Sequence, residues 1–227
     1  MARDGSRLRL AAASAGSAVT AAAALGLRDP LASMASYTAA LMALNQIAPP
    51  LLLAAFEQAR GREAERGRHR VVSASWSGVT AALFDPVAAF MGFGALSIAV
   101  SLPGLLDPTL AGALYAAPLG ALEMATGLMI WGQVMPATRR VRSDWRVALL
   151  VWAATVPMTV VAAVWMMSPD VIYTPYLDVI CRWNVPPLVD QKWAGFVMLL
   201  AGMPLQLAAA WLLLGLSSPH FRAPSET

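Results

Sequence analysis

Long apolar stretches separated by short, arginine-rich loops make up most of this sequence. Of its 227 residues, 58% are apolar and 13% are charged, whereas soluble domains carry about 25% charged residues. Its mean hydropathy is +0.60. Apolar stretches of this length favour lipid over water, so we expect an integral membrane protein. Spans of about 20 residues would use most of the chain, which predicts a single membrane domain over residues 1–227.

Six of the stretches are long enough to cross a bilayer as helices. The sequence therefore predicts an all-α bundle of six transmembrane helices. The expected spans are residues 10–27, 31–56, 86–106, 109–135, 147–167 and 192–216. The first of them follows three arginines, a pattern that fits a signal anchor, which we favour, or a cleaved signal peptide.

The second span contains a break. Its Pro49 and Pro50 follow Asn45 and Gln46, and a proline removes a backbone hydrogen bond from the preceding turn of a helix. The helix is therefore expected to kink or partly unwind before its inner end.

Residues 71–106 are too long for one helix. Asp85 and Pro86 fit the N-cap and the first position of a new helix. We expect a short helix along the membrane interface over residues 71–84, followed by the third span.

The basic residues are distributed unequally between the two sides of this layout. Thirteen lysines and arginines fall in the segments on one side, and only Arg28, Arg182 and Lys192 fall on the other. By the positive-inside rule, both chain ends are expected in the cytoplasm, and the protein in the inner membrane of a bacterium. Aromatic residues near the predicted span ends are expected as interfacial anchors. They are Trp145, Tyr173, Tyr176, Trp183 and Trp193.

Several function classes are excluded by residue type. The sequence pI is about 9.5, but the arginines lie in membrane loops, so nucleic-acid binding is not expected. One cysteine and two histidines, both in or near polar loops, cannot build a closed zinc or iron–sulfur centre or ligate a haem within the membrane. The sequence also has no nucleotide-binding glycine loop or nucleophile elbow. We therefore expect no enzyme and no bound cofactor, and among metals only copper remains open.

Glu123 lies near the middle of the fourth predicted span. An ionisable side chain at that depth costs several kcal/mol unless it is neutral, paired or hydrated, so it is a candidate binding residue. A protonated acid that joins two helices is the structural alternative. Asn45 and Gln46 are further candidates for a polar site, although amides in membranes more often link helices.

The twelve methionines suggest a copper site, because thioethers are soft ligands that suit Cu(I). Three of them, Met124, Met129 and Met135, share the span of Glu123. Their spacings of five and six residues do not place them on one helical face, so ordinary packing is the favoured interpretation.

Three segments together resemble the CtaG family of cytochrome c oxidase assembly proteins. The segments are YTAALMALNQIAPPLLL, then DPVAAFMGFGALSIAVSLPGLLD with ALEMATGLMIWGQVM, and finally LVDQKWAGFVMLLAGMPLQLAAAWLLL. The last is the most specific, because it is similar to the family's DQ-x-x-AG opening through Asp190, Gln191, Ala194 and Gly195. This resemblance implies a multi-span membrane protein that helps to install copper in haem–copper oxidases.

The family's histidines are missing from the matching segments. The corresponding positions hold Tyr37, Leu41, Ser101, Ala116 or Ala117, and Gly120. None of these side chains binds copper as imidazole does. The resemblance therefore implies an accessory role without direct copper delivery.

We predict an assembly protein that binds another membrane subunit of a haem–copper oxidase. Glu123, Asn45, Gln46 and Tyr37 are expected to line a partner or ligand site, and the Asp190–Gln191 turn its outer mouth. Two alternatives remain open: a small proton- or cation-coupled transporter using Glu123, and a structural subunit of a respiratory complex.

Overall fold

Helices form all the regular elements of the computed structural model in the part of the chain that it describes. The described residues are 2–65, 85–110, 112–135, 138, 143–177 and 181–214. The interfacial helix expected over residues 71–84 lies outside them.

The described helices follow one another along the chain. The α-helices are α1 (Ala2–Gly26), α2 (Met34–Met42), α3 (Ala48–Glu65), α5 (Pro86–Ala99), α6 (Pro103–Leu110), α7 (Ala113–Val134), α8 (Asp144–Met167) and α9 (Pro187–Leu213). Shorter elements are the 3₁₀ turns η1 (Pro30–Ala32) and η3 (Thr174–Tyr176) and the π-helical segment η2 (Ala43–Ile47).

Within the described residues, five helical stretches are long and apolar enough to cross a membrane, which makes this a multi-pass membrane protein. They are Ser6–Gly26, Met34–Phe56, Ala113–Val134, Asp144–Met167 and Pro187–Leu213. The sixth apolar helix, α5, has 14 residues and is about 21 Å long, short of the roughly 30 Å hydrocarbon core. The count of six spans therefore stays a prediction.

The third expected span differs from a single helix over residues 86–106. It begins as predicted, because the Asp85 carboxylate caps α5 by accepting hydrogen bonds from the backbone N–H groups of Val87 and Ala88 at 3.0 and 2.9 Å. However, α5 ends at Ala99 and the separate helix α6 begins at Pro103. Proline cannot donate a backbone hydrogen bond and disfavours helical backbone in the residue before it, so an apolar sequence alone does not continue the helix.

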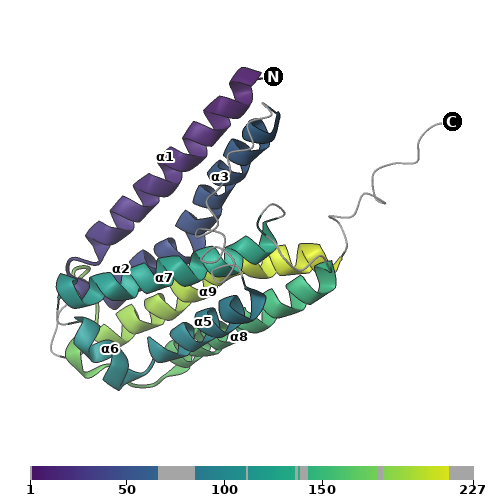
Figure 1. Ribbon diagram of the computed structural model, residues 1–227. Helices are drawn as coiled ribbons and strands as arrows, with labels where there is room; N and C mark the ends of the chain where they lie inside the picture. The colour runs from purple at the N-terminus through teal and green to yellow at the C-terminus, as the bar shows by residue number, and fades with distance from the viewer. Residues whose placement is uncertain are drawn as a thin grey trace.

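The helices form a bundle with a projecting arm (Figure 1). The bundle contains α2, α5, α7, α8 and α9, and α8 packs along α9. In the arm, α1 packs along α3, and the two point away from the bundle together. The small residue Gly16 permits this close packing, since a Cβ there would lie 2.8 Å from Leu52 Cδ2.

The chain turns from the bundle into the arm at the π-helical segment η2. In a regular helix, Pro49 and Pro50 would donate hydrogen bonds to the carbonyls of Asn45 and Gln46, but proline has no N–H. A wider π turn accommodates the two missing hydrogen bonds here, because Ala48 N–H bonds to the carbonyl of Ala43, five residues earlier. The predicted break in this span is thus confirmed.

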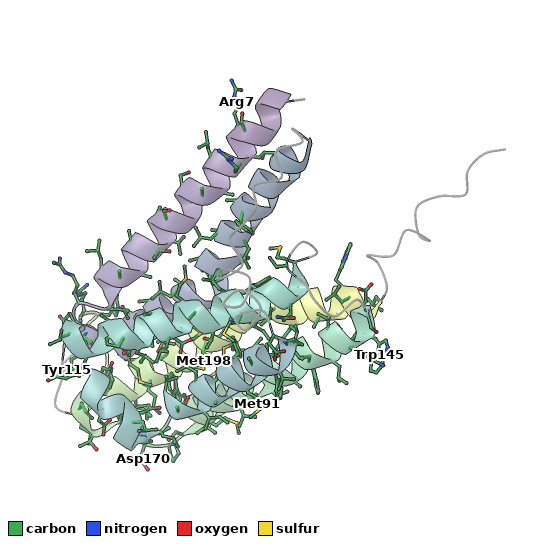
Figure 2. All side chains as sticks on the ribbon, viewed as in Figure 1. Arg7, Met91, Tyr115, Trp145, Asp170 and Met198 are labelled. Carbon is green, nitrogen blue, oxygen red and sulfur yellow. The ribbon has the colours of Figure 1, made fainter. Side chains whose placement is uncertain are left out.

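The loops before α2, between α5 and α7, and after α8 gather at one end of the bundle, here called the loop end (Figure 1). Figure 2 shows Tyr115 and Asp170 at this end and Trp145 at the opposite end. Trp145, Trp183 and Trp193 are exposed, as interfacial anchors would be. The same expectation is wrong for Tyr173 and Tyr176, which are buried because their phenol groups hydrogen-bond within the loops.

Candidate functional site

A buried polar network joins the π-helical segment to α7. The Asn45 side-chain amide donates hydrogen bonds to Glu123 Oε2 at 2.7 Å and to the Glu123 carbonyl at 3.0 Å, and lies 3.3 Å from Thr126 Oγ1. Gln46 Nε2 donates to Asn45 Oδ1 at 2.6 Å. Glu123 is 3% exposed, and Asn45 and Gln46 are 2% exposed. Three residues predicted as site residues thus lie together in the interior.

A glycine brings the two segments into contact at this point. A Cβ on Gly127 of α7 would overlap the Asn45 carbonyl oxygen and would lie 2.8 Å from Pro49 Cγ. Only a residue without a side chain allows the backbones to approach this closely. The contact holds Asn45 against the turn of α7 that carries Glu123 and Thr126.

A small cavity lies beside Glu123 in the centre of the bundle. Its volume is about 20 Å³, which is room for about one water molecule. Tyr37, Met42, Glu123 and Met198 lie in its wall, and Trp165 is also part of its lining. The lining residues include no lysine, arginine or histidine, so none of them can pair with the Glu123 carboxylate.

Asp190 belongs to a second cluster, at the loop end. Its carboxylate accepts hydrogen bonds from Ser33 Oγ at 2.8 Å, Met34 N at 2.6 Å and Ala35 N at 3.3 Å. One carboxylate therefore lies at the N-termini of both α2 and α9, where the helix dipoles stabilise negative charge. Asp190 is 2% exposed and its role in this structure is to join two helix starts.

Gln191 holds the loop that follows α8. Its Oε1 accepts from Ile172 N at 2.8 Å, and its Nε2 donates to the carbonyls of Trp165 and Asp170 at 3.4 and 3.3 Å. The Asp190–Gln191 pair thus joins the beginning of α2, the end of α8 and the beginning of α9.

Two tyrosines fasten the same loop to its neighbours. Tyr173 Oη donates to the Ser101 carbonyl at 2.8 Å, and Tyr176 Oη donates to the Pro30 carbonyl at 2.7 Å. Burial raises the pKa of both phenols above the usual value. Both groups therefore keep the proton that they donate.

A groove of about 290 Å³ separates α1 from α7. Six of its nine lining residues are small, namely Thr20 and Ala24 on α1 and Ala113, Ala117, Gly120 and Ala121 on α7, and the other three are Leu27, Leu44 and Met124. By contrast, the exposed face of α8 carries Leu149, Trp152, Val156, Val160 and Val164. Small residues are typical of surfaces where membrane helices pack together.

The sequence matches the Caa3_CtaG family, cytochrome c oxidase caa3 assembly factors, over residues 2–217. The chain belongs to this family. Nearly all of this Caa3_CtaG member is covered by the match, including both polar clusters. Comparison with curated proteins gave no match, and comparison with solved structures gave none either.

The predicted site residues of this family member fall into two groups. Asn45, Gln46 and Glu123 form the internal network, while Asp190 and Gln191 form the separate cluster at the loop end. Tyr37 lies in the cavity wall and is 2% exposed.

Sequence reasoning missed two methionines beside Glu123. The methionines that it singled out are Met124 and Met129 on α7 and Met135 directly after it, whereas Met42 and Met198 reach the cavity from α2 and α9. Met42 and Met198 lie far from Glu123 in the sequence, so no local sequence pattern linked them to it. Among the described residues, no group of three or more His, Cys, Asp or Glu side chains could hold a metal ion.

Proposed function

We propose that this chain assists the biogenesis of a haem–copper oxidase by binding a membrane subunit of that enzyme, without catalysing a reaction. Its membership of the caa3 assembly-factor family supports the oxidase as the target. The arginine distribution supports insertion in a bacterial inner membrane with both chain ends in the cytoplasm.

The groove between α1 and α7 is the surface that we assign to the subunit. The observation that supports this assignment is that six of the nine groove-lining side chains are small, whereas the exposed face of α8 carries large apolar side chains. Lipid chains pack well against large apolar side chains, but close helix contacts require small ones. Ala113, Ala117 and Ala121 are spaced four residues apart, so they form one row on α7 that a transmembrane helix can approach.

The polar clusters have a supporting role in this proposal. Asn45 and Glu123 are buried and bonded to each other, and Asp190 and Gln191 are satisfied by neighbouring loops. They hold α2, α7 and α9 in place, and α7 forms one wall of the groove. A partner helix thus needs no direct contact with them.

Filling the groove should abolish partner binding. We expect the double substitution Ala117→Leu with Ala121→Leu to reduce copurification of the oxidase subunit at least tenfold, because both side chains are exposed toward the groove. In a strain whose own gene is deleted, this variant should leave both oxidase activity and copper content per catalytic subunit at the level of the deletion.

The matched control is Val156→Leu with Val160→Leu on the exposed face of α8, which should restore the oxidase fully. Thermal unfolding in detergent checks that both variants fold. Full restoration by the groove variant would contradict the assignment of the surface, and an unaffected oxidase in the deletion strain would contradict the proposed function. Stoichiometric copurification with the mature enzyme would instead indicate a structural subunit.

A further inference from the structure

The side-chain amide of Asn45 faces Glu123 with its nitrogen. Asn45 Nδ2 lies 3.0 Å from the backbone carbonyl of Glu123 and 2.7 Å from Glu123 Oε2. A carbonyl oxygen can only accept a hydrogen bond, so the backbone contact determines which end of the amide faces this residue. Gln46 Nε2 donates in turn to Asn45 Oδ1 at 2.6 Å. Asn45 therefore presents only a donor to the carboxyl group.

This orientation determines where the Glu123 carboxyl group carries a proton. A carboxyl group inside a bilayer is most stable in its neutral form, and the adjoining cavity has no cation in its lining. The neutral form has one O–H donor. Because Oε2 accepts the hydrogen bond from Asn45, the O–H group is on Oε1. It needs an acceptor other than the Asn45 amide, and Glu123 also lines the cavity.

The cavity extends from Glu123 toward the loop end. Met42 and Met34 both line it and are eight residues apart on α2, which corresponds to about 12 Å. Met34 N donates to Asp190 at the loop end. Tyr176, in the loop after α8, is part of the same lining. The cavity thus leads from the interior carboxyl group to the loops on one side of the bundle.

Three residues of the cavity wall carry hydroxyl groups, namely Tyr37, Thr38 and Tyr176. A hydroxyl group can both donate and accept a hydrogen bond, so it can orient a water molecule in either sense. The volume of about 20 Å³ gives room for about one water molecule at a time. The two tyrosines are the only other titratable residues of the lining.

We propose that Glu123 binds an exchangeable proton that enters and leaves from the loop end through this cavity. In each exchange, Oε1 gives its proton to a water molecule in the cavity and takes another proton from it, so atoms and charge balance. Asn45 offers no acceptor on the opposite side. The proton is therefore bound from one side of the membrane and is not transported across it. None of the cavity-lining residues lines the proposed partner groove, so the two sites are independent.

Infrared spectroscopy of the purified full-length protein in phosphatidylcholine vesicles tests this site. At neutral pH we expect the C=O stretching band of one protonated carboxyl group, which should be missing in Glu123→Gln. Transfer from H₂O to D₂O should shift this band to lower frequency as the proton exchanges. Thr38→Val removes a hydroxyl group from the cavity wall with little change in shape, and should slow the shift at least fivefold.

The matched control is Thr126→Val. Thr126 Oγ1 lies 3.3 Å from the Asn45 amide, but Thr126 does not line the cavity, so this variant should exchange at the rate of the parent protein. A missing band in the parent protein, or a band that does not shift in D₂O, would overturn the proposal without any variant. An unchanged rate in Thr38→Val, or equal slowing in Thr126→Val, would overturn the route through the cavity.

Discussion

Asp190 stabilises two helix starts at once, and its removal should therefore cost more than loss of an ordinary cap. Asp190→Ala leaves Ser33 Oγ and Met34 N–H buried without their acceptor, and the half-buried Ala35 N–H also loses its partner. An unsatisfied buried donor costs about 1–3 kcal/mol, so we expect a loss of at least about 2 kcal/mol in the free energy of unfolding. Reversible denaturation in detergent measures it.

The matched control is Asp170→Ala, because the Asp170 side chain is exposed and only its backbone carbonyl binds Gln191. That change should stay within about 0.5 kcal/mol of the parent protein. Equal effects of the two substitutions would show that the carboxylate of Asp190 does not hold α2.

Asn45 is the donor on which the interior network depends. Asn45→Leu replaces the amide with an apolar side chain and leaves the Glu123 carboxyl group without the donor that binds its Oε2 at 2.7 Å. We expect a loss of about 1–3 kcal/mol in the free energy of unfolding. Gln206→Leu is the comparison, because its half-buried bond to Thr159 Oγ1 at 3.1 Å should contribute only about 0.6 kcal/mol. Similar losses in the two variants would contradict a special role for Asn45.

At the scale of elements, the contact between α7 and the π-helical segment should tolerate no side chain at Gly127. In Gly127→Ala the new methyl group would overlap the Asn45 carbonyl and lie 2.8 Å from Pro49 Cγ, and neither is the end of a flexible side chain. The two segments must separate, which lengthens the Asn45–Glu123 bond. We expect a lower unfolding temperature and an altered amide exchange rate in residues 43–47.

Gly92→Ala on α5 provides the control for that substitution. Its Cβ would meet only Thr126 Cγ2, at an ordinary distance of 3.7 Å. Alanine has a higher helix propensity than glycine, so this variant should be neutral or more stable. An unchanged unfolding temperature in Gly127→Ala would mean that the two backbones do not approach as closely as the structure describes.

Local features of the sequence predicted the elements better than their ends. Apolar length and the Asp85–Pro86 cap are properties of neighbouring residues, and both correctly predicted helices. The sequence predicts a helix that continues to residue 106, because the apolar run extends past Ala99. In the structure α5 ends at Ala99, and Pro103, which cannot donate a backbone hydrogen bond, begins α6.

At the scale of the whole molecule, the pairings of the candidate site could not be read from the chain. Asn45 and Glu123 were each predicted as polar site residues, but they are 78 positions apart and lie on different segments. Met42 and Met198 are similarly brought together only by the packing of α2 on α9. Local patterns indicate which residues are unusual in lipid, whereas helix packing decides which of them meet.

The projecting arm makes the molecule wider at one end of the bundle than at the other (Figure 1). Near the loop end, α1 meets the bundle, whereas at the other end α1 and α3 have diverged from it (Figure 1). With the bundle axis along the membrane normal, such a wedge would occupy more area in one leaflet than in the other. Its insertion therefore does work against lateral pressure that depends on lipid shape, so curved or cone-lipid-rich regions of the membrane should concentrate this protein.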